Sequence, residues 1–309
     1  MRSLSFASFY LFTSLLLQHC NNISAQDILA EADFSIENVT YLEIQGGFCN
    51  IKLNGYSGST LNMEGNIKGN GNPDKYEIIY SEENGRIKVW VEYPNNIWGN
   101  VQGLLRFDVP YNVQVIADNS SGNIDASDLN GREMNLEASS GNITAQRMKG
   151  ELYLKCSSGN VTLFDQEGNI TIRTSSGNLK IEKIDGDLIA HTSSGNIHIY
   201  TVEGNVFADC TSGNITMRDL EGVLEIESSS GNIRGASIML IGDSRFKATS
   251  GNITIGLLNK AEELSFNLDA GSGNLYAAGN KAEDKLILKK GPIMIYGITS
   301  SGTQRYTTD

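Results

Sequence analysis

The sequence has few of the residues from which metal sites, disulfide frameworks and nucleic-acid grooves are built. Its 309 residues include 3 His and 4 Cys, which leave little material for a transition-metal site, so we expect no metal and no cofactor. Acidic residues outnumber basic ones by 36 to 24. This argues against a nucleic-acid partner, because phosphate binding needs clustered Lys and Arg. The longest apolar run, residues 4–17, is too short for a membrane-spanning helix.

Glycine, in contrast, is abundant and regularly spaced. The string SSGN, with TSGN or GSGN in later copies, recurs with spacings of 19, then 18 five times, then 20 and 22 residues. A weaker glycine follows nine residues after most copies, so the unit is an 18-residue coil of two similar halves. A period of this kind is typical of a stacked repeat architecture. The repeated glycines are Gly122, Gly141, Gly159, Gly177, Gly195, Gly213, Gly231, Gly251 and Gly273.

Apolar residues alternate within each unit, which predicts strands rather than helices. Ile170 and Ile172 share one parity, as do Leu224 and Ile226, and a period of two is the strand signal. The glycine-rich segments between them would place poor helix formers on every second or third helical turn. We therefore predict an all-β fold, a parallel β-solenoid of 18-residue, two-strand coils. Right-handed coiling is the expectation for parallel crossovers.

Stacking the coils places equivalent residues in columns. Two residues after each repeated glycine stands an aliphatic residue, as in Val161, Leu179 and Ile197, which predicts a continuous core behind a parallel sheet. Directly after the glycine, all nine copies have asparagine. Stacked amides about 4.8 Å apart can hydrogen-bond along the column, so we predict a structural ladder formed by Asn123, Asn142, Asn160, Asn178, Asn196, Asn214, Asn232, Asn252 and Asn274.

The flanking segments are less regular. We expect residues 26–118 to form N-terminal strands and a capping region with an inserted hairpin at about 70–101, residues 119–280 to form the regular coils, and residues 281–309 to form a C-terminal cap. The whole of 26–309 is expected to be one continuous domain. Within the N-terminal region, Cys49-Asn50-Ile51 and Gly65-Asn66-Ile67 are typical of degenerate coil starts.

The beginning of the chain is typical of a secretory signal peptide. A short positive segment, residues 1–3, precedes the apolar run 4–17, and Ala25 ends a plausible cleavage site, so residues 1–25 are expected to be removed. A competing interpretation makes Cys20 a lipidated first residue, although His19 is large where a small residue is preferred. Either way the sequence predicts an exported protein, in the periplasm, on the outer surface or secreted, with no transmembrane helix in the mature chain.

The repeat motif resembles a known bacterial family. The pattern SSGNI…xGxL, the segment Phe107-Asp108-Val109-Pro110, and Leu42-Glu43-Ile44 followed by Ile51-Lys52-Leu53 together are similar to the exported β-strand-repeat "putative adhesin" family, a domain of unknown function. The resemblance covers nearly the whole mature chain. It implies a β-solenoid and envelope or adhesive roles, and it supplies no catalytic residues. The chain departs from the pattern at Cys49 and in the segment 70–101.

No motif predicts catalysis or strong metal binding. Glu167, Asp185, Glu203 and Glu221 form an acidic column on the second turn, but the calcium-binding repeat motif is missing and basic residues intrude, which favours a solvated turn. No nucleophile elbow, zinc motif or phosphate loop occurs. Cys156 and Cys210 share a column three coils apart, roughly 14 Å, which is too far for a disulfide.

The remaining candidates are side chains predicted to point outward. Exposed aromatic and aliphatic groups on a flat sheet could stack on sugars or on a partner protein, so the expected partner is an envelope glycan or another surface protein. We therefore predict a non-enzymatic, adhesin-like interaction module. The alternative is a carbohydrate-active enzyme whose carboxylate pair lies where the 70–101 segment overhangs the coils. The candidate surface-binding residues are Tyr153, Phe164, Ile189, Tyr200 and Phe207.

Overall fold

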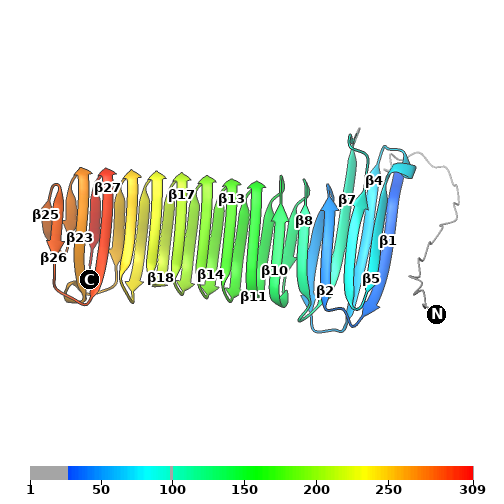
Figure 1. Cartoon of the computed structure of the whole chain (residues 1–309), viewed down its shortest axis with the longest axis horizontal. Helices are drawn as coiled ribbons and strands as arrows, with labels where there is room; N and C mark the ends of the chain where they lie inside the picture. The colour runs from blue at the N-terminus through cyan, green and yellow to red at the C-terminus, as the bar shows by residue number, and fades with distance from the viewer. Residues whose placement is uncertain (1–26, 98–99, 309) are drawn as a thin grey trace, which may run out of the picture.

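The computed structural model describes residues 27–97 and 100–308. The expected signal peptide, residues 1–25, and Cys20 both lie outside the described residues. The described chain is an elongated stack of strands with two short 3-10 turns, η1 (Pro73–Lys75) and η2 (Ala261–Glu263) (Figure 1). The expected all-β class and mostly parallel pairing are confirmed.

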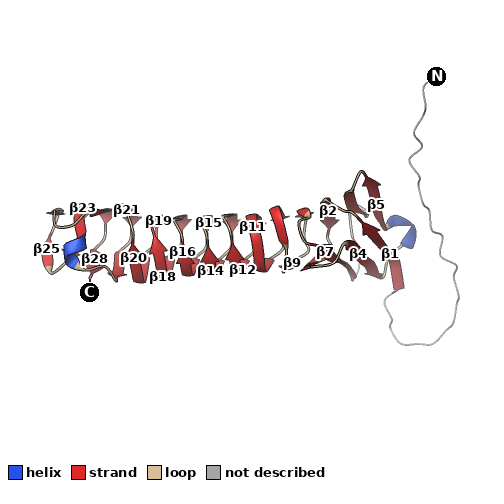
Figure 2. Ribbon diagram, turned by 90° about the horizontal axis from the view of Figure 1, so that it is seen from below, coloured by secondary structure: helices blue, strands red, loops and turns tan. Residues whose placement is uncertain are grey.

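The strands lie in two layers, joined by turns along both long edges (Figure 2). We call the layers face A and face B. Face A contains, in spatial order, β5 (Glu77–Glu83), β6 (Arg86–Glu92), β2 (Tyr41–Gly47), β8 (Gln114–Asn119), β10 (Asn130–Ala138), the second half of β11 (Ile143–Ser158), β13 (Ile170–Ser176), β15 (Leu188–Ser194), β17 (Val206–Ser212), β19 (Leu224–Ser230), β21 (Ser244–Ser250), β27 (Ile293–Ser301), β23 (Leu264–Ser272) and β26 (Lys285–Leu288).

Face B follows the same direction with the other strand of each coil. It contains β1 (Asp27–Glu37), β4 (Thr60–Gly69), β7 (Val101–Pro110), β3 (Asn50–Tyr56), β9 (Ile124–Ser127), the first half of β11, β12 (Val161–Glu167), β14 (Leu179–Asp185), β16 (Ile197–Glu203), β18 (Ile215–Gly222), β20 (Ile233–Leu240), β22 (Ile253–Leu257), β28 (Gln304–Thr307), β24 (Leu275–Ala277) and β25 (Asn280–Ala282).

The central strands pair in parallel with a register of eighteen residues. Val161 lies opposite Leu179, and Leu179 opposite Ile197. All three side chains have no solvent exposure. The aliphatic column is therefore the core between the two faces, as the glycine period and the alternation predicted. Burial of this kind is the main favourable contribution to folding.

The repeated glycine is required by the close approach of successive coils at one edge. A Cβ built on Gly195 would lie 2.0 Å from the carbonyl oxygen of Gly177, and the φ of Gly195 is +150°. Side chains with a Cβ rarely adopt that backbone conformation. Next to this contact, the backbone N–H of Asn196 donates to Oδ1 of Asn178 at 2.9 Å, and its Nδ2 donates to the same oxygen at 3.3 Å.

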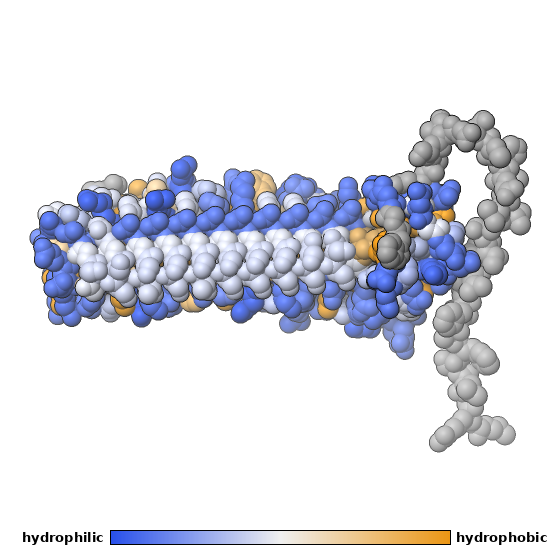
Figure 3. Space-filling model, turned by 90° about the horizontal axis from the view of Figure 1, so that it is seen from above, coloured by the Kyte–Doolittle hydropathy of each residue, from blue (hydrophilic) through white to orange (hydrophobic). Residues whose placement is uncertain are grey.

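The same pair of donors recurs from coil to coil. The backbone N–H of Asn142 donates to Oδ1 of Asn123, and that of Asn252 to Oδ1 of Asn232. The row extends one coil further than the nine asparagines suggested, because Asn50 accepts from the N–H of Asn123. Each amide thereby satisfies a turn N–H that the strand ladder leaves free. In Figure 3 these amides follow a hydrophilic line beside the paler Ser, Thr and Gly edge.

The C-terminal end differs from the prediction in its order. After β22 the chain passes to β23 and β24, returns through β25 and β26, and inserts β27 and β28 between the two earlier coils. Asn274 therefore does not follow Asn252 in the row. Thr303 stands between them and donates its N–H to Oδ1 of Asn252 at 2.8 Å. The physical reason is a tenth turn, Ser300-Ser301-Gly302-Thr303, in which threonine occupies the asparagine position.

The N-terminal end is built from an excursion between β3 and β8. β4 runs antiparallel to both β1 and β7, so the interpretation of Gly65-Asn66-Ile67 as a coil start is wrong. β5 and β6 form a hairpin, and β6 pairs edge to edge with β2. The hairpin, residues 77–92, therefore lengthens face A at its end and is not an overhang above the coils.

Candidate functional site

The outer side of face A carries a column of apolar and aromatic side chains. Tyr153, Thr171, Ile189 and Phe207 lie opposite one another on four successive strands; we call these four residues the face A strip. Ile189 is 41% exposed and Phe207 36% exposed, and Tyr153 is half-buried. Because neighbouring strands lie about 4.8 Å apart, the strip is flat and continuous, and it is open to a ligand from one side.

A column of charged side chains borders the strip. Lys155, Arg173, His191 and Asp209 occupy the same four strands, two residues further along. Nζ of Lys155 lies 2.9 Å from Oε2 of Glu137, and that hydrogen bond raises the pKa of Lys155.

Two further members of this column pair with each other. Nδ1 of His191 lies 3.2 Å from Oδ1 of Asp209. Arg173 has no ion pair among residues 27–97 and 100–308, so its exposed guanidinium is the cation beside the strip that stays available to a ligand.

The other two candidate residues lie on the opposite layer. Phe164 and Tyr200 flank Glu182 on face B. Phe164 is 41% exposed, and Tyr200 is half-buried. Since the core separates the layers, the five candidates form two surfaces: Tyr153, Ile189 and Phe207 on one and Phe164 and Tyr200 on the other.

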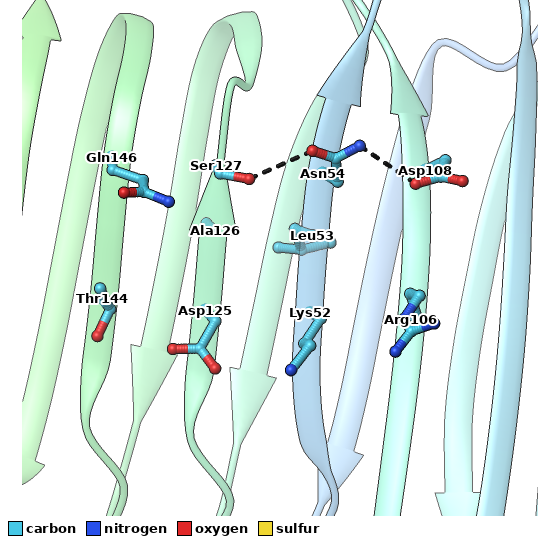
Figure 4. A pocket seen from close by; sticks show the side chains of 10 residues that line it. All are labelled: Lys52, Leu53, Asn54, Arg106, Asp108, Asp125, Ala126, Ser127, Thr144 and Gln146. Atoms are coloured by element: carbon cyan, nitrogen blue, oxygen red, sulfur yellow. Dashed lines mark hydrogen bonds between the residues drawn. The ribbon is translucent and has the colours of Figure 1, made fainter.

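A shallow polar depression of about 440 Å³ lies on face B near the N-terminal end (Figure 4). It crosses β7, β3, β9 and β11, and its polar side chains stand in two rows with Leu53 and Ala126 between them. Nδ2 of Asn54 donates to Oδ1 of Asp108 at 3.3 Å, and Oγ of Ser127 donates to Oδ1 of Asn54 at 3.3 Å. Two cations and two carboxylates balance the charge. The lining residues are Lys52, Leu53, Asn54, Arg106, Asp108, Asp125, Ala126, Ser127, Thr144 and Gln146.

The sequence did not predict this depression, because β7 belongs to the excursion between β3 and β8 and only the fold places it beside β3. The arrangement does not match a glycosidase pair, which needs two carboxylates facing one sugar bond. Asp108 lies on β7 and Asp125 on β9, and β3 places Lys52 and Asn54 between them. No observation in the described part of the chain favours the enzyme alternative.

The three cysteines that the structure describes are structural rather than nucleophilic. Cys49, Cys156 and Cys210 are free and buried, as expected for the pair three coils apart. Burial raises the pKa of Cys49 to about 12 and raises the pKa of the other two thiols. A thiol that stays protonated is a poor nucleophile.

The acidic column is a row of exposed carboxylates on face B. Glu167, Asp185, Glu203 and Glu221 lie on four successive strands of face B and are exposed. Nζ of Lys149 lies 2.8 Å from Oε2 of Glu167, which neutralises one end. Within the described ranges, no group of three or more His, Cys, Asp or Glu side chains is arranged to hold a metal ion.

One corner position combines backbone strain with charge. Asp128 and Arg147 both have positive φ, and two hydrogen bonds of 2.6 Å join the guanidinium to the carboxylate. That bonding lowers the pKa of Asp128 and raises the pKa of Arg147. The two charged groups already pair with each other, so this corner offers no charge to a ligand. The pair instead links two neighbouring coils at their corner.

Among residues 27–97 and 100–308, no helix is long and apolar enough to cross a membrane.

Comparison with known proteins gives a family match and several structural neighbours. A family model described as Toastrack DUF4097 matches residues 57–218 and residues 206–293. No curated protein matches the chain significantly.

The neighbours include three solved structures of low identity. A "putative adhesin" from Bacteroides fragilis is 11% identical, covers 90% of this chain and 97% of its own, and has a TM-score of 0.40. A "putative cell adhesion protein" from Clostridium sporogenes is 10% identical, with 90% and 100% coverage and a TM-score of 0.23. A "putative lipid binding protein" from Parabacteroides distasonis is 12% identical, with 89% and 96% coverage and a TM-score of 0.38.

Proposed function

Because the chain belongs to the Toastrack DUF4097 family, whose function is not known, we propose a role for it from its own surface. The protein is an exported, non-enzymatic interaction module that binds an envelope glycan through the face A strip. Export follows from the signal-like residues 1–25. The observation that carries the binding role is the exposure of Ile189 and Phe207, side by side on a flat sheet.

The chemistry of the strip suits a sugar chain with anionic groups. An exposed ring such as that of Phe207 packs against the apolar face of a sugar. Arg173 lies on β13, the strand next to the one that carries Ile189. Its planar guanidinium group can form two parallel hydrogen bonds to a carboxylate or sulfate. A flat column of four strands fits an extended chain better than a small molecule, which prefers a concave site.

The test is a binding screen of the purified protein against arrayed glycans and envelope fractions. The informative variant is Ile189→Ala with Phe207→Ala. The matched control is Phe164→Ala with Tyr200→Ala, which removes two apolar groups from the opposite layer. We expect the face A variant to bind at least tenfold more weakly, a loss of about 1.4 kcal/mol, and the control to bind as the unmodified protein does.

Two results would contradict the proposal. One is glycan binding that the face A variant leaves unchanged. The other is the absence of binding to every glycan and envelope fraction in the screen while circular dichroism shows the protein to be folded.

A further inference from the structure

Four strands at the two ends of the stack have a single hydrogen-bonded partner each. β1 pairs with β4 alone and β5 with β6 alone at one end; β25 pairs with β24 alone and β26 with β23 alone at the other (Figure 1). Each therefore has a second edge that no described strand occupies. Open edges of this kind are templates for pairing with another chain.

The N-terminal end is acidic. β1 carries Asp27, Glu31, Asp33 and Glu37, and β5 carries Glu77, Glu82 and Glu83; neither strand contains a Lys or Arg. All seven carboxylate residues are exposed. Within the described part of the chain, none of the seven takes part in an ion pair. We call β1 and β5 together the acidic end.

The C-terminal end is basic. β25 carries Lys281 and β26 carries Lys285, and Lys289 and Lys290 follow directly after β26. All four lysines are exposed. The acids in this stretch are Glu283 and Asp284, and Asp269 of β23 lies 4.0 Å from Nζ of Lys285, so lysines outnumber acids between residues 280 and 290. We call β25 and β26, with the two lysines that follow, the basic end.

Each end also exposes an aliphatic side chain that lies outside the core. Ile28 on β1 is 54% exposed, and Ile287 on β26 is 51% exposed. Apolar groups next to an unpaired edge gain by burial when another strand is added. Two copies meeting through like ends would place equal charges opposite one another, which is unfavourable across a strand pair. Opposite ends avoid this.

We propose that a second copy of this chain docks on these ends, with the basic end of one molecule on the acidic end of the next. The contact extends both layers: β26 lies along β5, which continues face A, and β25 lies along β1, which continues face B. The contact is heterologous and leaves one acidic and one basic end free, so it repeats into an open rod. The proposal does not depend on the glycan-binding role, because the face A strip lies in the middle of the stack.

The experiment reverses charge at each end and measures mass in solution. One variant carries Lys285→Glu and Lys289→Glu, the other Glu77→Lys and Glu82→Lys. A control carries Arg218→Glu and Arg234→Glu, exposed mid-stack residues of face B, and changes the net charge by the same amount as the first variant. Mass photometry and analytical ultracentrifugation are run at one fixed salt concentration, after circular dichroism shows that each protein is folded.

We expect the unmodified protein and the control to form dimers and longer species as concentration rises. Each end variant alone should associate at least tenfold more weakly, because β5 and the residues 285–290 that dock along it then carry net charges of the same sign. A mixture of the two end variants should again form complexes, since the unmodified basic end of the Glu77→Lys, Glu82→Lys variant can dock on the unmodified acidic end of the Lys285→Glu, Lys289→Glu variant. A monomeric unmodified protein at every concentration, an end variant that associates normally, or a mixture that stays monomeric would each overturn the proposal.

Discussion

At the scale of the residue, a position in the eighteen-residue unit decides which environment a side chain has. Leu179 points into the core with no exposure, and Lys180 beside it is exposed, because successive residues of a strand point to opposite sides. The alternation therefore predicted that Ile189 and Phe207 face outward. It did not predict the ion pairs, such as Lys155 with Glu137, since those depend on which charges the stacking brings together.

Truncating a core side chain should lower the free energy of unfolding much more than truncating the exposed side chain next to it. Leu179→Ala removes a buried group between Val161 and Ile197, and we expect it to lower the free energy of unfolding by about 2–5 kcal/mol. Lys180→Ala, the matched control, should change it by less than about 0.5 kcal/mol. Chemical denaturation measures both. Equal effects of the two substitutions would mean that Leu179 is not in the core.

At the scale of the element, the glycine period predicted the strands between residues 124 and 257 well, because each coil there is a local copy of the previous one. It failed at both ends, because the order of the strands there depends on long excursions of the chain and not on a local repeat. Whether β27 lies beyond β23 or between β23 and β21 depends on the long return through β25 and β26, and no local pattern records such a return. The depression on face B was missed likewise, since β7 joins β3 across an excursion of the chain.

Removing residues 292–309 tests the role of the inserted coil. The deletion takes away β27 and β28, which are the partners of β21, β22, β23 and β24. We expect proteases to cleave residues 258–291 at least tenfold faster than in the full chain, because strands without partners open more readily. A chain that ends at Thr307 keeps both strands and serves as the control. Equal resistance of the two shortened chains would contradict the inserted position of the coil.

At the scale of the whole molecule, the protein is a two-layered stack whose surfaces are columns of equivalent residues. Its core is closed between the layers, so a ligand meets an outer face, a long edge or an end. The proposed glycan surface is such a face, and the proposed contact between copies uses both ends. Both proposals depend on the order in which the coils are stacked.

Distances along one outward column measure that order directly. Lys180 belongs to a column of face B that passes through Thr254, Arg305 and Tyr276 and reaches Lys281. At about 4.8 Å per strand, residue 305 should lie about 24 Å from residue 180, and residue 281 about 34 Å from it. Cysteines introduced at these exposed positions carry spin labels, which report both distances. Cys20 is replaced by Ser, and the buried native thiols stay unlabelled.

We predict that the label at position 305 lies nearer to position 180 than the label at position 281 does, although residue 305 is later in the sequence. A label at position 305 as far away as that at position 281, or farther, would contradict it.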